Sequence, residues 1–282
     1  MAQPLKENKE EENGMDGCNG YDGYRAIAAV YDRLNAEIDY GAWADFVEAC
    51  FSRYLDKRPT LVLDLACGTA SMTLSLAARG YDMIGVDGSM DMLSVAYERA
   101  AEQERTGVLF LLQDMRAFEL YGTVGAVTCC LDSVNYLLTP QDVERCFRCV
   151  HNYLDPDGLF LFDVNTPYKF KHVYGDNAYV LQDEWTDEDG KSQAVYCGWQ
   201  NHFDTETGLC DFDLSVFEQR ADGSYDRADE QQKERCYTKE QLQTLLEQCG
   251  FEVLGCFGGW DFSLPQPDCE RWYFVARCIK GK

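Results

Sequence analysis

The feature that most constrains this chain is a short apolar run from Leu61 to Leu65 that ends in small residues around Gly68. A run too short for a helix and followed by small residues is typical of a buried parallel strand, and the apolar positions of Met72 to Ala78 predict a covering helix. A second apolar run ends at Asp87, roughly 20 residues after the glycine turn, where an acidic side chain can accept both hydroxyls of a ribose. Because ligands of such units sit beyond the carboxyl ends of the strands, the sequence predicts a nucleoside site there.

A carboxylate at the tip of the first strand, Asp64, indicates which nucleoside ligand the site binds. It would repel the pyrophosphate of NAD or FAD, whereas it would attract an ammonium group. Ala66 and Ala70 stand where the G-x-G-x-x-G turn has glycines that let the backbone approach a phosphate. S-adenosylmethionine fits these residues better, because it carries a ribose, an amino-acid end and a sulfonium cation but no phosphate. The alternative is an ordinary strand-to-helix turn in another doubly wound protein.

Short motifs end the successive strands of the predicted sheet: Asp64-x-x-Cys67-Gly68-Thr69, Gly85-Val86-Asp87-Gly88-Ser89-x-Asp91-Met92-Leu93, Gln113-Asp114-Met115-Arg116 and Asp132-Ser133-x-Asn135-Tyr136-Leu137. In this order they resemble the motifs of class I S-adenosylmethionine-dependent methyltransferases. The chain is also similar to the YqeM-like group of bacterial methyltransferases in two flanking regions, Val30-Tyr31-Asp32-x-Leu34 with Tyr40-x-x-Trp43, and Glu270-Arg271-x-x-Phe274-Val275-Ala276. The resemblance runs from about Tyr24 to the C-terminus and departs at Ala66 and Ala70, where the family usually has glycine.

Strand-like and helix-like segments alternate through the middle of the chain and predict a parallel sheet. The expected strands are Leu61 to Leu65, Asp82 to Val86, Val108 to Gln113, Ala126 to Leu131 and Leu159 to Val164, and the expected helices are Ala70 to Arg79, Ser89 to Gln103 and Gln141 to Leu154. After a capped helix from Lys239 to Cys249, the strands Phe251 to Phe257 and Arg271 to Cys278 complete the sheet. The resemblance implies that these last strands form an antiparallel hairpin. The expected fold class is α/β, with a Rossmann-like seven-stranded methyltransferase sheet that is mostly parallel.

The alternation stops between about residues 168 and 234, where we expect no helical segment. The stretches Ala194 to Phe203 and Leu209 to Arg220 are strand-like and flank a hairpin signal, Asp204 to Gly208. Trp185 to Gly190 offers a second turn. We therefore expect an antiparallel β-sheet inserted after the fifth strand, at the carboxyl edge where substrate enters.

These patterns divide the chain into regions. Residues 1–20 are charged and lack periodicity, which predicts a disordered acidic tail. Residues 21–57 carry apolar residues at helical spacing and are expected to form N-terminal helices over the cleft. Residues 58–167 and 235–282 form the expected S-adenosylmethionine-binding domain, and residues 168–234 form the inserted substrate or lid subdomain.

The charge balance limits the partners of the protein. A net charge of -24 argues against nucleic acid, because phosphate binding relies on clustered lysine and arginine. No stretch approaches the roughly 18 uninterrupted apolar residues of a membrane span, and the N-terminus is acidic, so we expect a cytoplasmic protein with no membrane partner. A small-molecule acceptor is the expected partner, and both a monomer and a homodimer remain open.

The 14 cysteines are scattered, several of them inside apolar runs, which favours free buried thiols. Cys146-x-x-Cys149 has the spacing of metal ligands but lacks a second cysteine or histidine pair. We therefore expect no metal.

Candidate cofactor residues follow the first two strands. Asp64, Ala66 and Gly68 are expected at the methionine end, where Asp64 acts on the ammonium group through charge-assisted hydrogen bonds. Asp87, with Gly88 beside it, is expected at the ribose. Turn geometry alone is the alternative for the first three.

The adenine is expected near the second and third motifs. Asp114 can accept from the adenine amino group while Met115 supplies the neighbouring amide, although Asp114 is alternatively a turn cap. Met92, in the second motif, is also expected to bind the cofactor. The resemblance implies that an apolar side chain, Met90, packs on the adenine face. Ser89 is expected to cap the following helix.

Methyl transfer from a sulfonium requires a nucleophile in line with the methyl carbon at about 3 Å, so positioning and exclusion of water dominate. A general base is required only if the nucleophile arrives protonated. Asp132 is expected at the methionine end or the methyl region, and Asn135 with Tyr136 at the substrate, against the alternative of a simple Asx turn. The resemblance implies that Tyr24 and Tyr31, on an N-terminal helix, place hydroxyls over the cofactor; aromatic core packing is their alternative.

Other polar residues after the fifth strand are candidates for the acceptor pocket: Asp163, Asn165, Tyr168 and His172. For His172 an ordinary surface position is the alternative. Arg271 either holds a carboxylate of the substrate or pairs with Asp261.

The favoured function is transfer of a methyl group to a nitrogen or oxygen of a small molecule. One rival is a cofactor-binding module without catalysis, which Ala66 and Ala70 permit. A protein substrate is a further possibility within the enzyme class. An NAD(P)-linked oxidoreductase is disfavoured by the carboxylate of Asp64.

Overall fold

The computed structural model describes residues 24–25, 27–186 and 190–280, so the tail expected over residues 1–20 lies outside the described residues. The larger of its two sheets consists of β1 (Leu61–Leu65), β2 (Asp82–Asp87), β3 (Val108–Leu112), β4 (Val124–Cys129), β5 (Leu154–Asn165), β10 (Phe251–Phe257) and β11 (Arg271–Cys278). Its strand order is β10-β11-β5-β4-β1-β2-β3, and only the pairings of β11 with β10 and β5 are antiparallel. The predicted seven-stranded, mostly parallel sheet with a C-terminal hairpin is therefore confirmed.

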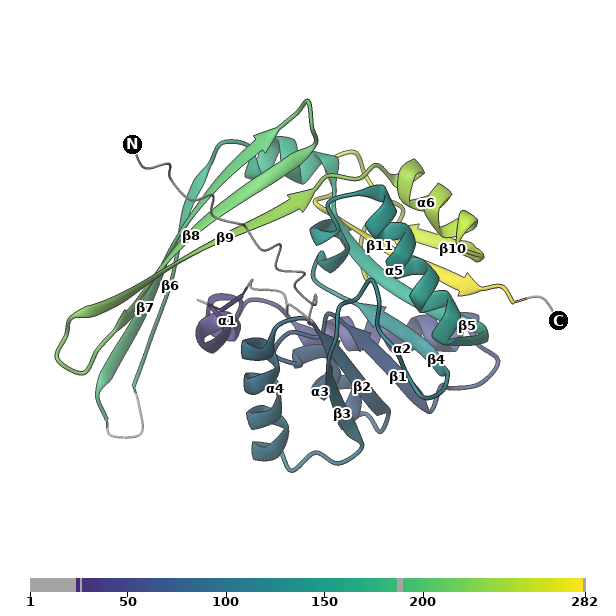
Figure 1. The fold of residues 1–282 in the computed structure, drawn as a ribbon, viewed down its shortest axis with the longest axis horizontal. Coiled ribbons are helices and arrows are strands. Elements are labelled where there is room, and N and C mark those ends of the chain that lie inside the picture. The colour runs from purple at the N-terminus through teal and green to yellow at the C-terminus, as the bar shows by residue number, and fades with distance from the viewer. Residues whose placement is uncertain (1–23, 26, 187–189, 281–282) are drawn as a thin grey trace, which may run out of the picture.

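A separate antiparallel sheet projects from the larger one (Figure 1). It consists of β6 (Ala178–Thr186), β7 (Ser192–Asp204), β8 (Leu209–Gln219) and β9 (Tyr225–Arg235), paired in that order. The inserted sheet and its β7–β8 hairpin confirm the prediction, while β6 and β9 were not predicted as individual strands. The expectation of no helix in this region is wrong, because Lys169–Tyr174 forms a short helix, η3.

Helices cover both faces of the larger sheet. The α5 (Pro140–Tyr153) and α6 (Lys239–Gln248) helices bury Phe147 and Leu246 in one core, whereas α2 (Tyr40–Tyr54) and α3 (Ser71–Ala78) bury Phe46 and Leu76 in another. The α4 helix (Met90–Glu102) packs Leu93 beside α3 and β3. Among the described residues, no helix combines the length and apolar composition needed to cross a bilayer.

Local signals account for the starts of several helices. The Ser89 side chain accepts a hydrogen bond from the Met92 amide, so its predicted role as the cap of α4 is confirmed. Thr238 and Gln241 form the reciprocal capping box of α6. Thr139 caps α5, whose first residue is Pro140.

The N-terminal region is less helical than its apolar spacing predicts. Among its described residues, the part ahead of α2 contains only η1 (Ala28–Val30) and α1 (Tyr31–Leu34). Tyr24 precedes both and has a positive φ of 69°, so the expectation that Tyr24 lies on a helix is wrong. Tyr31 does lie in α1. This region packs its Ile27 and Val30 against the apolar face of the inserted sheet.

Candidate active site

Three predicted site residues meet because their strands are neighbours in the larger sheet. Asp64 lies in β1, Asp87 ends β2 and Asp132 follows β4, and β1 pairs with both β2 and β4 in parallel. Parallel strands present their carboxyl ends at one edge of a sheet, which is where ligands of this architecture bind. The inserted sheet and the segment before α2 lie along the same edge (Figure 1).

The turn after β1 adopts a left-handed backbone at Ala66, Gly68 and Ala70, with φ of 56°, 54° and 66°. Glycine adopts this conformation without strain, whereas an alanine Cβ is crowded by the backbone. The left-handed backbone therefore explains why glycine is usual at these two positions, and the turn is formed here with alanine at both. A carbon added at Gly68 would meet no atom of the described residues within 4 Å, so the backbone of the turn borders open space.

Asp87 links the end of β2 to this turn. Its Oδ2 accepts a hydrogen bond of 2.8 Å from the Gly68 amide, and its Oδ1 accepts one of 2.8 Å from the Ser89 amide. Gly88 also donates its amide to the carboxylate. Burial raises the pKa of Asp87, and these amides oppose the shift. The residue predicted at the ribose is thus held rigidly beside the open side of Gly68.

Asp64 is buried, with 2 % of its surface exposed. Its Oδ2 accepts a hydrogen bond of 2.5 Å from Thr73, and its Oδ1 accepts one of 2.9 Å from Thr128. Burial raises its pKa to about 6, although the threonine hydroxyls oppose this. In this geometry Asp64 ties α3 and β4 to β1, and its predicted contact with an ammonium group remains a prediction.

The residues predicted at the adenine lie around the end of β3 and the start of α4. Arg116 binds the Asp114 carboxylate through its backbone and guanidinium, so the alternative role of Asp114 as a turn cap is present. Burial would raise the pKa of Asp114, but the Arg116 guanidinium lowers it overall. Met115, beside Asp114, packs partly buried against the main core. At α4, Met90 is 58 % exposed whereas Met92 is 2 % exposed, so Met90 is the methionine available to a planar ligand.

Asp132 belongs to a buried ionic cluster. Arg271 Nη1 lies 2.9 Å from Asp132 Oδ1 and also pairs with Asp163, so Arg271 binds these two carboxylates and not Asp261. Leu131 and Asp132 have left-handed backbones, and their amides donate to Asp163 at 2.8 and 3.0 Å. Burial alone would raise the pKa of Asp132, but the positive charges of Arg271 and Lys169 lower it overall.

Asn165, at the end of β5, connects this cluster to the inserted sheet. Its Nδ2 donates to Asp132 Oδ2 at 2.9 Å, to Glu234 Oε2 at 2.9 Å and to the Tyr174 hydroxyl at 3.3 Å. Its Oδ1 accepts a hydrogen bond of 3.1 Å from Lys169. Glu234 lies in β9, so the polar core of the site draws on both sheets.

Asn135 and Tyr136 lie in η2 (Ser133–Tyr136), directly after Asp132. The Asn135 amide is fully buried, accepting from the Asn165 amide at 3.0 Å and donating to the Arg235 carbonyl at 2.8 Å. Tyr136 donates its hydroxyl to Gln232 of β9 at 2.8 Å. In this geometry the Asn135 side chain holds β5 and β9 together, and its contact with a substrate remains a prediction.

The short segment before α2 is fastened over the turn. Asp32 accepts hydrogen bonds from Thr69 at 2.9 Å, Ser71 at 3.0 Å and Arg99 at 2.8 Å. The neighbouring Tyr31 has a pKa raised well above its usual value, first by burial and then by the nearby negative charges, so its hydroxyl remains protonated. Tyr31 packs edge-on against Tyr24, with ring centroids 5.8 Å apart.

Sequence reasoning missed the contribution of β9. Its inward positions Glu230, Gln232 and Glu234 are buried, although the segment Tyr225–Arg235 has the composition of a solvent-exposed stretch. The signal that was available is the period of two in glutamate and glutamine, which is typical of one face of a strand. Of the other candidates, Asp163 and Asn165 lie in the cluster, while Tyr168 and His172 stack on each other in the segment from Tyr168 into η3.

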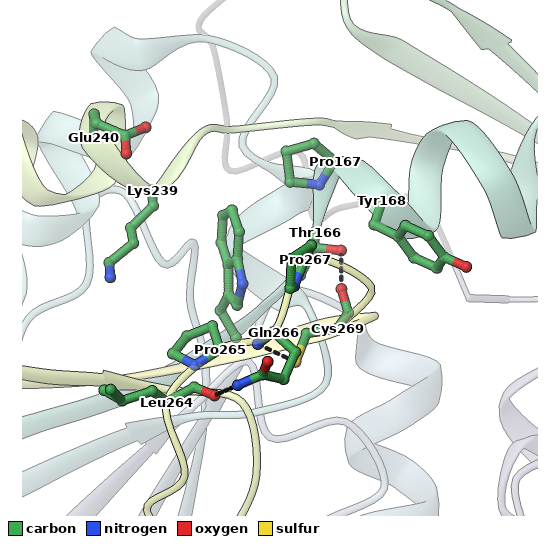
Figure 2. Close-up of a pocket in the computed structure, with 11 residues that line it drawn as sticks. Thr166, Pro167, Tyr168, Lys239, Glu240, Leu264, Pro265, Gln266, Pro267 and Cys269 are labelled. Carbon is green, nitrogen blue, oxygen red and sulfur yellow. Dashed lines mark hydrogen bonds between the residues drawn. The ribbon is translucent and has the colours of Figure 1, made fainter.

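A separate cavity of about 500 Å³ lies between the segment after β5, the start of α6 and the loop before β11 (Figure 2). Thr166, Lys239, Pro265 and Trp272 help to line it, and the Thr166 hydroxyl donates to the Cys269 carbonyl at 2.5 Å. Neighbouring residues of a strand point to opposite faces of the sheet. Trp272 lines this cavity, so the cavity lies on the opposite face of β11 from the side chain of Arg271. None of the strand-end carboxylates lines it.

The chain matches the family model of the methyltransferase domain over residues 62–158. It is 32% identical to the YqeM protein of Bacillus subtilis (strain 168), which carries the name of a methyltransferase, over 91% of this chain and 98% of that protein. It is 25% identical to a glycine/sarcosine N-methyltransferase of Halorhodospira halochloris over 88% of this chain and 86% of that protein. A crystal structure of an S-adenosylmethionine-dependent methyltransferase from Clostridium acetobutylicum ATCC 824 superposes with a TM-score of 0.78 at 28% identity, covering 91% of this chain and 99% of that one.

The fold and the strand-end carboxylates define an S-adenosylmethionine-dependent methyltransferase. Within that class, the chain belongs to the YqeM-like family.

Proposed function

We propose that this methyltransferase acts on a nitrogen or oxygen nucleophile of a small-molecule acceptor by in-line displacement. The observation that carries the proposal is the meeting of Asp64, Asp87 and Asp132 at the carboxyl edge, beside a turn whose backbone borders open space at Gly68. The similarity to a glycine/sarcosine N-methyltransferase supports a small acceptor.

The residues at this edge suit S-adenosylmethionine. The rigid carboxylate of Asp87 is oriented to accept the ribose hydroxyls, and the exposed Met90 offers an apolar surface to the adenine. Asp64 is the candidate for the ammonium group, which favours its ionised form. When bound, the cofactor supplies a methyl group on a sulfonium, and no acid is required for the leaving thioether.

The residues beyond the cofactor edge position the acceptor in this proposal. Asp132 stays ionised beside Arg271 and presents negative charge where the reaction moves positive charge from sulfur to the acceptor. Tyr31 keeps its proton and can donate a hydrogen bond toward the same region. The N-terminal segment, fastened by Asp32, and the inserted sheet exclude water.

Calorimetry with S-adenosylmethionine, followed by an assay for S-adenosylhomocysteine release with small amines and alcohols, tests this function. We expect saturable cofactor binding and release that depends on an acceptor. Cofactor binding without release would favour a binding module, and release only with a basic protein would favour a protein substrate. Failure to bind S-adenosylmethionine would contradict the proposal.

A further inference from the structure

Two acidic side chains, Asp132 and Glu234, join the two sheets at the carboxyl edge. The Asn165 amide donates to Asp132 Oδ2 and to Glu234 Oε2, both at 2.9 Å, so the two carboxyl groups lie side by side. Two buried carboxyl groups side by side favour a proton on one of them, because two negative charges would repel each other. Burial and then the negative charge of Asp132 raise the pKa of Glu234 well above its usual value, whereas the pKa of Asp132 is lowered. The proton therefore resides on Glu234.

The charges around this pair are balanced when Glu234 is protonated. The groups that face it are Asp132 after β4, Tyr136 of η2, Asp163 of β5, Lys169 and Tyr174 of η3, Cys210 of β8 and Arg271 of β11. Arg271 and Lys169 offset the two aspartates, and Glu270 also acts on Lys169, so ionisation of Glu234 adds negative charge that no further cation of the cluster matches. The cluster can take up one positive charge at that point.

A second observation on the same face of the inserted sheet concerns buried polar atoms without hydrogen-bond partners. Asn201 of β7 is 3 % exposed, and neither Nδ2 nor Oδ1 of its side chain has a hydrogen-bond partner within the described chain. The Trp199 indole nitrogen is likewise buried without a partner among those residues. Asn201 lies opposite Phe212, which lies opposite Gln232, so Asn201 shares a face with Glu234, two residues further along β9.

Leaving a buried polar group without a partner costs about 1–3 kcal/mol, so native proteins rarely keep one for packing alone. Here an orphaned amide and an acid pair occupy one inner face, above the end of β4. Their combination matches a ligand with a cationic group at one end and a hydrogen-bonding group at the other.

Resting on the proposed function, we propose that the acceptor is a polar amine, whose nitrogen lies at Asp132 and Glu234 and whose second polar group contacts Asn201. An amine arrives in water as an ammonium ion without a lone pair for attack. Binding of the ammonium displaces to solvent the proton that Glu234 holds in the free enzyme. The ammonium then gives one of its own protons to the Glu234 carboxylate and becomes a neutral amine. The nitrogen lone pair then forms the bond to the methyl carbon as the carbon–sulfur bond breaks, with its electron pair remaining on sulfur.

This step moves the positive charge from sulfur to nitrogen, so the Asp132 carboxylate stabilises the charge that develops. The methylated ammonium leaves with its charge, and Glu234 is left protonated, as it is in the free enzyme. An alcohol would not present a cation to the pair, so the site discriminates against it.

The first test compares wild type, Glu234→Gln and Glu218→Gln, the last an exposed glutamate on β8. The acceptor probes are glycine, sarcosine, ethanolamine and glucosamine, with glycolate, ethylene glycol and glucose as hydroxyl counterparts. We expect turnover of at least one amine and of no hydroxyl counterpart. Glu234→Gln should lower kcat/KM by about 10² or more and remove the rise of rate with pH, while its dissociation constant for S-adenosylmethionine and its melting temperature stay close to those of wild type.

The second test keeps the proposal falsifiable if Glu234→Gln does not fold. Asn201→Leu removes the orphaned amide, so we expect unchanged or higher thermal stability together with an increase of about tenfold in KM for the amine and little change in kcat. Gln200→Leu, at the exposed neighbouring position, is its control.

These outcomes separate the inference from the proposed function. A protein that binds S-adenosylmethionine but turns over none of the amines, or prefers the hydroxyl probes, overturns the amine assignment only. Equal activity of Glu234→Gln and wild type, or an unchanged KM in Asn201→Leu, also overturns it. Loss of cofactor binding in the wild-type protein would instead overturn the proposed function.

Discussion

The Asp87 carboxylate accepts a hydrogen bond of 2.8 Å from the Gly68 amide, joining the end of β2 to the turn after β1. One side chain therefore both shapes the turn and faces the space beside it. Under the proposed contact of Asp87 with the ribose, cofactor affinity and the conformation of the turn are coupled through this bond.

Replacing Asp87 by alanine should weaken the binding of S-adenosylmethionine by about 1–3 kcal/mol, the scale of lost buried hydrogen bonds. Isothermal titration calorimetry measures the change. Asp82→Ala, at the exposed opposite end of the same strand, should bind like wild type. An unchanged affinity in Asp87→Ala would remove the ribose assignment.

Glycine at Ala66 or Ala70 should relieve backbone strain, because both alanines have a left-handed φ. The relief of roughly 1–2 kcal/mol is partly offset by the greater freedom of glycine in the unfolded chain, about 0.5–1 kcal/mol. We expect the free energy of unfolding in urea to rise by up to about 1.5 kcal/mol. Ala77→Gly, inside α3, should instead lose about 1 kcal/mol, and a similar loss at Ala66 and Ala70 would argue against strain at the turn.

Asp64 should make cofactor binding depend on pH, because its pKa is raised to about 6. The ammonium group of the cofactor favours ionised Asp64, so affinity should rise by about tenfold between about pH 5 and 7. The sign for stability is opposite: the stabilisation from protonated Asp64 is fully present below its ordinary pKa of 3.8 and is lost as pH rises through about 6. Calorimetry across this range with Asp64→Asn as the comparison checks the first point, and a flat profile in wild type would exclude contact with the ammonium.

Asp32→Ala should loosen the segment before α2, because it removes hydrogen bonds from Thr69, Ser71 and Arg99. We expect a loss of about 1–2 kcal/mol in the free energy of unfolding, since the network is partly exposed. Faster proteolysis within residues 27–38 would show that the loss is local. The comparison is Asp45→Ala, whose partner Arg79 forms an exposed pair, for which we expect about 0.5 kcal/mol or less.

The core of the fold could be predicted because its signals are local. Leu61 to Leu65 and the small residues after it specify strand and turn within ten positions, and Ser89 and Thr238 mark helix starts by their caps. Neighbouring motifs then predict which carboxylates share an edge, since parallel strands align their ends.

The rest of the site depends on contacts between distant segments. Glu234 meets Asn165 across 69 positions, and Asn135 meets Arg235 across 100, so no local pattern reports them. The charged sequence of β9 hides its buried face, because three inward polar residues replace the apolar ones that usually reveal a strand. The positive φ of Tyr24 similarly breaks a helix that apolar spacing alone predicts.

The inserted sheet reaches the larger sheet chiefly at the end of one strand, where β9 delivers Glu234 to Asn165. Under the proposed assignment, Glu234 and Asn201 contact the acceptor from the inserted sheet, whereas the residues proposed to hold the methyl donor belong to the larger sheet. Divergence within residues 178–235 can then produce enzymes with new acceptors from an unaltered donor-binding half.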